Sequence, residues 1–280
     1  MKNDIEIRIL ALTLARGGSK SVLKKNIKPI FGLPLISYTI NEALKSKYIT
    51  RYIVSTDDRE IQQIAIQYGA EAPFLRPIEL SSDKASSVSA LQHAVNWAEN
   101  EEGNKYDYVV ELMCTNPMKT VEDIDSSIEK LISTNADSVI AVHQLEDHHP
   151  ARIKKIIDDK IVDFCIQEIP ESRRQDLKPD AFIRSGSIYA LKRDYLMLEG
   201  KRYGSENSRP YILPKERAVN IDTEKSAGAW MVGFIDNFKE GNLSPLAKRK
   251  MDATNNKGKK GIKFSREASE KVQSIYDSKG

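Results

Sequence analysis

Hydrophobic and polar positions along the chain predict strands and helices that follow one another. Residues 7–14 are apolar apart from Arg8 and Thr13, which is typical of a strand buried on both faces of a parallel sheet. Pro34 stands where a helix can begin, and the apolar residues after it recur at helical spacing: Leu35, Ile36, Ile40, Ala43 and Leu44. Residues 52–55 predict a second strand, and Asp57 is a candidate cap for a helix that carries Ile61, Ile64 and Ala65.

The alternation continues toward the middle of the chain. We expect helices around residues 90–97 and 124–132, and strands at residues 108–113 and 138–142. Such alternation indicates crossover connections and therefore an α/β fold: a mostly parallel, doubly wound, Rossmann-like sheet with helices on both faces. Ligands of these sheets bind beyond the carboxyl ends of the strands. The loops that follow residues 14, 55 and 113 should therefore line one cleft.

The segment from about residue 145 to residue 188 has a different character. It is polar and contains the run Glu171-Ser172-Arg173-Arg174-Gln175-Asp176. We interpret it as an insertion, either a lid or an arm that packs on a second subunit. A strand at residues 186–191 resumes the alternation, and a last helix is expected at residues 227–238. This division predicts a main domain over residues 1–240 and a basic extension over residues 241–280.

Composition narrows the class of protein. Hydrophobic residues make up 40% and charged residues 30% of the 280 residues, the balance of a folded globular protein. No apolar run reaches the roughly 18 residues of a membrane-spanning helix, and charged residues interrupt the N-terminus where a signal peptide would be apolar. The two cysteines, Cys114 and Cys165, do not suggest a disulfide framework, and no His/Cys cluster has zinc spacing. We expect a cytoplasmic protein with reduced thiols.

The net charge of +3 owes much to basic residues that crowd between Lys248 and Lys263. A basic tail can contact nucleic acid or an acidic membrane surface. This stretch has no aromatic residue for stacking on bases, however, and its sequence Asn255-Asn256-Lys257-Gly258 is typical of a solvated linker. We therefore favour a solvated extension, and we expect neither nucleic acid nor a membrane as a partner.

The loop after the first strand carries candidate phosphate ligands. It reads Ala15-Arg16-Gly17-Gly18-Ser19-Lys20. Glycines let backbone amides approach phosphate oxygens, and the nearby cations Arg16, Lys20, Lys24 and Lys25 offset their charge. Taken alone, the pattern fits an ordinary solvated turn equally well, and it is neither a Walker loop nor a dinucleotide-binding fingerprint.

Further motifs follow in a fixed order: Lys25-Asn26, Gly32-x-Pro34-Leu35-Ile36, Ser55-Thr56-Asp57 and Arg76-Pro77-x-Glu79-Leu80-Ser81-Ser82-Asp83. With the first loop, they make residues 7–238 resemble the acylneuraminate cytidylyltransferases, also called CMP-sialic acid synthetases. The resemblance implies transfer of CMP from CTP to a nonulosonic, sialic-acid-like sugar, with pyrophosphate released, Mg²⁺ as cofactor and a homodimer. It places the nucleotide on Arg16, Gly17, Gly18, Ser19, Lys25, Asn26, Arg76 and Ser82, of which the last two read cytosine.

Three segments depart from the family pattern, one of which, Phe182-Ile183-Arg184-Ser185-Gly186, replaces a common Phe-Arg-Pro-Asn-Gly-like segment. The usual Asp-Ile-Asp metal motif is Asn220-Ile221-Asp222 here, so one carboxylate has become an amide. Because Mg²⁺ prefers hard oxygen ligands, we expect Asp222 and Asn220 to hold it. The usual Leu-Gln-Pro-Thr-Ser-Pro-Leu-Arg is Leu112-Met113-Cys114-Thr115-Asn116-Pro117-Met118-Lys119, so Met113 replaces the Gln that touches the acceptor in the family.

The acceptor sugar is expected to contact Thr115 and Asn116. Its carboxylate needs a cation, which Arg174, Arg173 or Arg184 can supply, although solvated arginines on a lid are an equally good interpretation.

The implied reaction is a displacement at the α-phosphorus of CTP by the anomeric hydroxyl of the sugar. The predicted catalytic residues are Arg16 and Lys25, which steady the departing pyrophosphate, and Asp222, which holds the metal and is the candidate base. Two alternatives stay open. One is a related nucleotidyltransferase that uses another acidic sugar or another nucleotide. The other is a CTP-binding homologue with weakened catalysis, which Asn220 and Met113 make conceivable.

Overall fold

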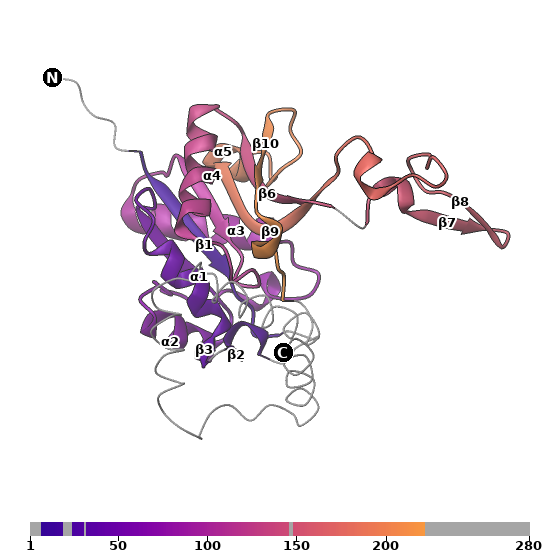
Figure 1. Ribbon diagram of the computed structural model, residues 1–280. Helices are drawn as coiled ribbons and strands as arrows, with labels where there is room; N and C mark the ends of the chain where they lie inside the picture. Colours follow the sequence, from indigo (N-terminus) through magenta and orange to yellow (C-terminus); the bar gives the residue numbers. More distant parts are fainter. Residues whose placement is uncertain (1–6, 19–23, 31, 146–147, 222–280) are drawn as a thin grey trace, which may run out of the picture.

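A computed structural model of the chain describes residues 7–18, 24–30, 32–145 and 148–221 (Figure 1). Its centre is a six-stranded sheet in the order β10-β6-β9-β5-β1-β4. The strands are β1 (Ile9–Leu14), β4 (Arg51–Ser55), β5 (Tyr108–Leu112), β6 (Ser138–Gln144), β9 (Phe182–Lys192) and β10 (Ser208–Ile212). Strand β1 is parallel to β4 and β5, β6 is parallel to β10, and β9 runs antiparallel to its neighbours β5 and β6. The predicted α/β class with a mostly parallel sheet is confirmed.

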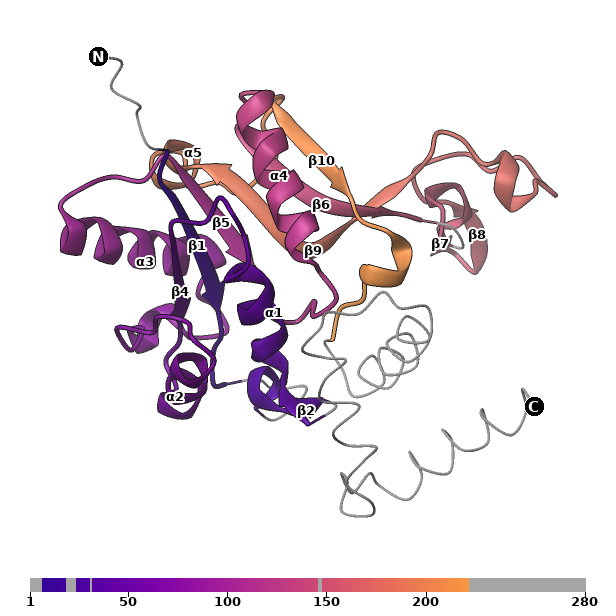
Figure 2. The same cartoon turned by 60° about the vertical axis from the view of Figure 1, so that its left-hand side comes forward.

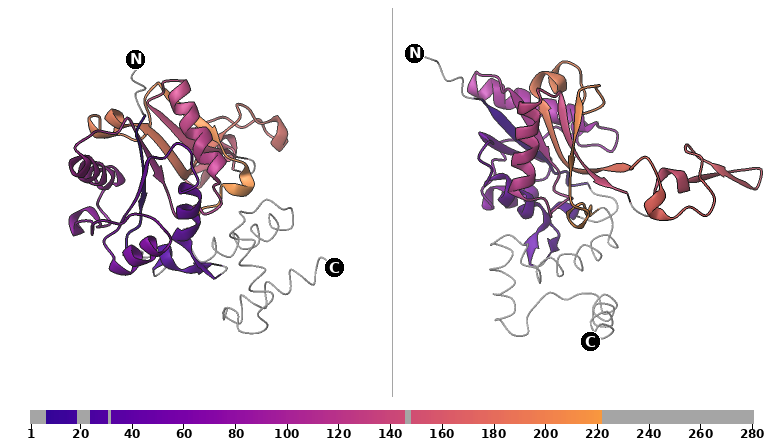
Figure 3. Two further views of the ribbon diagram at one scale, coloured as in Figure 1. Left: turned by 90° about the vertical axis from the view of Figure 1, so that its left-hand side faces the viewer. Right: turned by 45° about the horizontal axis from the view of Figure 1, so that its top comes forward.

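Helices cover both faces of this sheet (Figures 2 and 3). Helices α1 (Leu35–Ala43), α2 (Arg59–Gln67) and α4 (Val121–Ser133) pack on one face, and α3 (Ser87–Glu102) and α5 (Arg193–Met197) pack on the other. Strand β1 shows why its sequence is continuously apolar: Ile9 and Ala11 face the first group of helices, and Leu10 and Leu12 face the second. The sheet is therefore doubly wound, as predicted.

Local signals set the beginnings of the helices, with one correction. Helix α1 begins directly after Pro34, as predicted. The prediction that Asp57 caps α2 is wrong by one residue, because Asp58 has the extended backbone of a cap and its carboxylate accepts the amides of Glu60 and Ile61. Asp57 instead accepts a hydrogen bond of 3.0 Å from the Gly17 amide.

The predicted insertion leaves the sheet as an arm (Figure 1). The arm carries an antiparallel hairpin of β7 (Lys154–Ile157) and β8 (Lys160–Asp163), which extends away from the sheet and its helices. Strand β9 pairs with β6 from Phe182 onward, so the sheet resumes before residue 188. A second small hairpin, β2 (Pro29–Ile30) with β3 (Leu33–Pro34), precedes α1.

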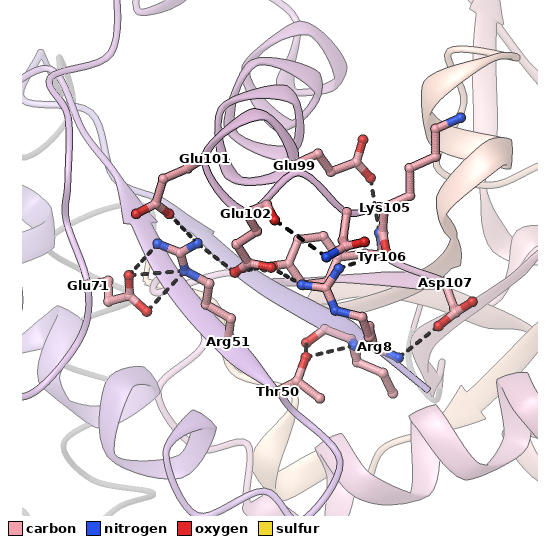
Figure 4. Close-up of polar contacts among 12 residues, drawn as sticks. Arg8, Thr50, Arg51, Glu71, Glu99, Glu101, Glu102, Lys105, Tyr106 and Asp107 are labelled. Atoms are coloured by element: carbon pink, nitrogen blue, oxygen red, sulfur yellow. Dashed lines mark hydrogen bonds and ion pairs between the residues drawn. The ribbon is translucent and has the colours of Figure 1, made fainter. Parts of the chain in front are cut away.

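A charged network ties the amino-terminal ends of the strands to helix α3 (Figure 4). Arg51 opens β4 and forms ion pairs of 2.7 Å with both Glu71 and Glu102. Arg8, just before β1, pairs with Glu102 and stacks on Tyr106 at 4.5 Å. This network lies at the opposite end of the strands from the predicted cleft. Substitutions in it can therefore serve as controls for substitutions in the cleft.

Several predictions concern residues outside the described part of the chain. They are the helix at residues 227–238, the extension at residues 241–280, and the positions of Ser19, Lys20 and Asp222. The boundaries of the main domain therefore stay a prediction. Both cysteines are free, and no helix in the described ranges is long and apolar enough to cross a membrane.

Candidate active site

A polar cleft of about 470 Å³ opens at the carboxyl ends of β1 and β5. Strand β4 lies on one side of β1, and β5 lies on the other. The connections from β1 to its two neighbours therefore run in opposite directions, and the loops after β1 and β5 diverge to leave a crevice. The cleft is lined by residues from these loops and the start of α3: Leu14, Arg16, Lys25, Asn26, Arg76, Leu80, Ser81, Ser82, Asp83, Ala85, Ser86, Ser87, Ala90, Glu111, Met113, Cys114 and Thr115. Its volume is that of a small-molecule site.

The loop after β1 is fixed to the end of β5 through Asn26. The buried Asn26 donates from Nδ2 to the Arg16 carbonyl at 2.9 Å, and its Oδ1 accepts the Cys114 thiol at 3.0 Å. A Cβ on Gly17 would lie 2.7 Å from the Asp58 carboxylate, so the loop approaches the α2 cap more closely than a side chain permits. Asn26 therefore shapes the candidate phosphate loop, in addition to its predicted position near the nucleotide.

The cations of this loop differ in where they point. Arg16 lines the cleft and pairs with Asp83, another lining residue, at 2.7 Å, with both side chains partly exposed. Lys25 lines the cleft. Lys24 pairs with Glu60 at the surface of α2, and this contact raises the pKa of Lys24. Arg16 and Lys25 are thus the cations of the described loop that line the cleft.

Arg76 is a buried guanidinium at the floor of the cleft. Its Nε donates to Ser81 Oγ at 3.0 Å, its Nη1 to the Ser55 carbonyl at 3.4 Å, and its Nη2 lies 3.8 Å from Asp57. Burial lowers the pKa of Arg76, and the nearby carboxylate opposes that shift. Ser82 also lines the cleft, but the hydroxyl that Arg76 contacts is that of Ser81.

The loop between β5 and α4 joins the cleft to the segment that precedes Asp222. Asn116 donates from Nδ2 to the carbonyls of Ser185 at 3.0 Å and Val219 at 3.1 Å. The Thr115 carbonyl accepts the Ile221 amide at 2.8 Å. Asn116 was predicted to contact the acceptor sugar. It uses both of its side-chain amide hydrogens to hold the loop against β9 and residues 218–221.

The predicted metal ligands are only partly within the described residues. Asn220 is exposed on the segment that Thr115 and Asn116 hold, whereas Asp222 lies outside the description. Between residues 7 and 221, the described side chains form no group of three His, Cys, Asp or Glu that could hold a metal. The Asn220 carbonyl is an oxygen donor of the kind that Mg²⁺ accepts, so the segment fits such an ion only together with phosphate oxygens, water and Asp222.

The three arginines that are candidates for binding the carboxylate of the acceptor sugar lie in different parts of the structure. Arg173 pairs with Asp176 at 2.7 Å on the exposed arm, and Arg174 lines a different hollow, between the arm and β6. Arg184 lies on β9, with its guanidinium 4.3 Å above the Tyr203 ring. It lies two residues before Gly186, where a Cβ would meet Met113 Sδ at 3.7 Å, and Met113 lines the cleft.

Sequence reasoning missed a buried ion pair in the cleft wall. Glu111 lies on β5, and its carboxylate accepts Arg202 Nη1 at 2.6 Å, while Arg202 stacks on Tyr189 at 4.7 Å. Burial raises the pKa of Glu111, and Arg202 opposes this shift. A glutamate inside the apolar run of β5 was the signal for this pair, although nothing in the sequence pointed to Arg202.

Comparison with known proteins identifies the family. Residues 10–201 match the cytidylyltransferase family. Pseudaminic acid cytidylyltransferase of Campylobacter jejuni is 33% identical over 215 residues, which are 76% of this chain and 90% of that protein. N-acylneuraminate cytidylyltransferase of Escherichia coli is 30% identical over 216 residues, 77% of this chain and 49% of that protein.

A solved structure agrees with the fold. The structure of CMP:2-keto-3-deoxy-manno-octonic acid synthetase complexed with CTP superposes with a TM-score of 0.61 at 18% identity, over 82% of this chain and 99% of that one. The family predicted from the motifs is confirmed by the match over residues 10–201 and by these relatives. The chain therefore belongs to the cytidylyltransferase family of nucleotidyltransferase enzymes.

Proposed function

We propose that the protein transfers CMP from CTP to a nonulosonic acid and releases pyrophosphate. The observation that carries this proposal is the cleft at the ends of β1 and β5, where Arg16, Lys25 and the buried Arg76 come together. The relatives support the choice of acceptor, because one is named for pseudaminic acid and another for N-acylneuraminate.

The nucleotide would occupy the side of the cleft formed by the first loop. Arg16 and Lys25 bind the triphosphate together with the amides of Gly17 and Gly18, and Ser19 completes this loop. Arg16 exchanges its ion pair with Asp83 for phosphate oxygens. Arg76, already held by Ser81 and bordered by Ser82, presents fixed hydrogen-bonding groups to cytosine.

The acceptor would enter along β9. Arg184 is the preferred cation for its carboxylate. It lies on β9 two residues before Gly186, whose neighbour Met113 lines the cleft, and it forms no ion pair within the described residues, whereas Arg173 and Arg174 lie on the arm. Stacking on Tyr203 limits the rotation of the guanidinium and orients its edge. Thr115 borders the same space.

The proposed chemistry is one displacement. The anomeric hydroxyl attacks the α-phosphorus, the bond from phosphorus to the bridging oxygen breaks, and Arg16 and Lys25 stabilise the negative charge that develops on pyrophosphate. Asp222 is the proposed acceptor of the hydroxyl proton. Asn220 and Asp222 would hold Mg²⁺, and the bound ion would add positive charge beside the reacting phosphate.

The proposal is tested by measuring pyrophosphate release with each ribonucleoside triphosphate against sialic, pseudaminic and legionaminic acids. We expect turnover only where CTP and one of these acids are both present. Preference for another nucleotide would favour a related nucleotidyltransferase. Tight CTP binding with no turnover on any acid would favour a binding homologue instead.

Arg184→Ala tests the acceptor assignment. The variant should raise KM for the acid about tenfold or more and leave CTP affinity unchanged, because a charge-assisted contact is lost on the acceptor side only. Arg173→Ala is the matched control, and its KM should equal that of the wild type. Equal effects of the two substitutions would contradict the assignment.

We also propose a homodimer formed through the arm, in a cytoplasmic protein. The hairpin exposes Ile156 and Ile161, which are paired across its strands and are 77% and 76% exposed, and Phe164, directly after β8, is exposed as well. A two-stranded hairpin has no core of its own, and exposed apolar groups of this kind mark contact surfaces. A second copy that offers the same side chains would cover both hairpins at once.

Sedimentation velocity tests the dimer. Ile156→Asp combined with Ile161→Asp should shift the protein to the monomer, whereas Ile66→Asp, at a 55% exposed position on α2, should not. A wild-type protein that sediments as a monomer at micromolar concentration would refute this part of the proposal.

A further inference from the structure

Lys119 belongs to the β5–α4 loop and is buried, with 1% of its surface exposed. Its Nζ donates to Thr39 Oγ1 at 2.8 Å, to the Met113 carbonyl at 2.8 Å and to the Asn116 carbonyl at 2.6 Å. None of these three acceptors is a carboxylate. Burial of a lysine is costly even when it is hydrogen-bonded. The contacts of Lys119 with both ends of one turn offset this cost and indicate a structural role for the side chain.

The three contacts of Lys119 close the loop on itself and attach it to α1, which carries Thr39. The same loop reaches three other parts of the active site. Cys114 binds Asn26, which holds the carbonyl of Arg16 in the phosphate loop. Asn116 binds β9 and residues 218–221, and the Thr115 carbonyl binds that segment a second time.

We propose that Lys119 is a positioning residue that fixes the spacing between the nucleotide loop, the acceptor strand β9 and the segment that carries Asn220. It acts through the backbone of the β5–α4 loop and touches neither substrate. This inference rests on the proposed function, since it concerns how the two substrates of that reaction are brought together.

The contacts of Lys119 persist in both of its protonation states. Burial lowers the pKa of Lys119 to about 7, against the opposing influence of Cys114, Glu42 and Asp123. A charged ammonium donates all three hydrogen bonds. A neutral amine still donates to the carbonyls of Met113 and Asn116 and accepts the hydroxyl hydrogen of Thr39. The loop is therefore held throughout the neutral pH range.

Lys119→Met tests the proposal, because methionine retains much of the length of the side chain and removes its hydrogen bonds. We expect kcat/KM for the acceptor acid to fall about tenfold or more, while the CTP Kd measured by calorimetry stays within about twofold of the wild type. The groups proposed to bind CTP lie on other loops, so a loss confined to the transfer step distinguishes misplacement from general damage. Thr39→Val removes one of the three contacts and should give a smaller loss of the same kind.

Lys130→Met is the matched control, since Lys130 also donates to a backbone carbonyl, that of Pro210 at 2.7 Å, but lies away from the cleft. Its kinetics should equal those of the wild type. A Lys119→Met variant with kcat/KM within twofold of the wild type would overturn the proposal. An equal loss of CTP affinity and of kcat/KM would overturn it as well. If Lys119→Met does not fold, the same criteria applied to Thr39→Val decide.

A readout without activity separates this inference from the proposed function. A wild-type protein that turns over no pair of substrates defeats the proposed function. Hydrogen exchange then decides the inference: amides of residues 113–119 and 218–221 should exchange faster in Lys119→Met, or in Thr39→Val, than in Lys130→Met. Equal exchange in both segments would overturn it.

Discussion

Replacing Arg76 by methionine should weaken CTP binding without unfolding the protein. The Arg76 side chain is 3% exposed and is held by Ser81 at 3.0 Å, so its guanidinium is already fixed before the nucleotide arrives. Methionine keeps most of the apolar stem and removes the charge. Asp57, which lies 3.8 Å away and is 24% exposed, can be solvated when its neighbour is lost.

The magnitude follows from the contact that is removed. A hydrogen bond to a charged group contributes about 1.5–3 kcal/mol, and a tenfold change in Kd corresponds to about 1.4 kcal/mol. If Arg76 donates one such bond to the base, its loss predicts a CTP Kd that is about 10 to 100 times higher. No conformational entropy is recovered to offset this loss, because the side chain is ordered in the free protein.

Isothermal titration calorimetry with CTP measures this change, and Arg51→Met supplies the control. Arg51 is 13% exposed and pairs with Glu71 and Glu102 at 2.7 Å, but it lies at the opposite end of the strands (Figure 4). Arg51→Met should lower Tm by about 2–4 °C for each kcal/mol lost and leave the CTP Kd unchanged. An Arg76→Met variant that binds CTP within twofold of the wild type would refute the assignment, as would equal weakening in both variants.

Three further predictions concern stability and reactivity. The wild type should gain stability over the Lys119→Met variant as the pH rises from about 7 to about 10.5, by up to about 1.4 kcal/mol per pH unit. The reason is that the pKa of Lys119 is lowered to about 7, so in this range the unfolded chain binds a proton that the folded protein does not. A pH-independent difference between the two proteins in urea denaturation would contradict this. Cys165 should react with Ellman's reagent at pH 8 while Cys114 stays protected, since Cys114 is buried and its pKa is raised to about 11; equal rates would be the contrary result. Asp123→Asn should cost about 1.5–3 kcal/mol, because the fully buried carboxylate accepts two hydrogen bonds from Arg217. An unchanged denaturation midpoint would speak against that role.

The sequence predicted the elements whose burial leaves a periodic pattern. Strand β1 is apolar throughout because helices cover both of its faces, and α1 and α4 repeat apolar residues at helical spacing because one side faces the sheet. Strand β10 was missed because it is an edge strand that contains Pro210 and exposes Ile212. The hairpin of β7 and β8 was missed as well, since its apolar side chains are exposed and follow no core-facing pattern.

For the candidate site, the motifs indicated which residues come together, and the contacts show how they are held. Arg76 is distant in sequence from Arg16 and Lys25, yet all three line one cleft, as their order in the family pattern implied. The contacts of Lys119 with α1 and of Glu111 with Arg202 could not be predicted, because each joins residues whose proximity depends on the finished fold. No local spacing rule encodes such pairs.

The central claim is that this chain couples CTP to a nonulosonic acid. Phosphorus NMR of a reaction that contains the protein, CTP, Mg²⁺ and pseudaminic or sialic acid tests it most directly. The account predicts that the triphosphate signals of CTP disappear while pyrophosphate and a CMP-sugar phosphodiester appear in equal amounts, and that both products require the acid. Unchanged CTP signals with every acid, or release of pyrophosphate without a sugar phosphodiester, would contradict it.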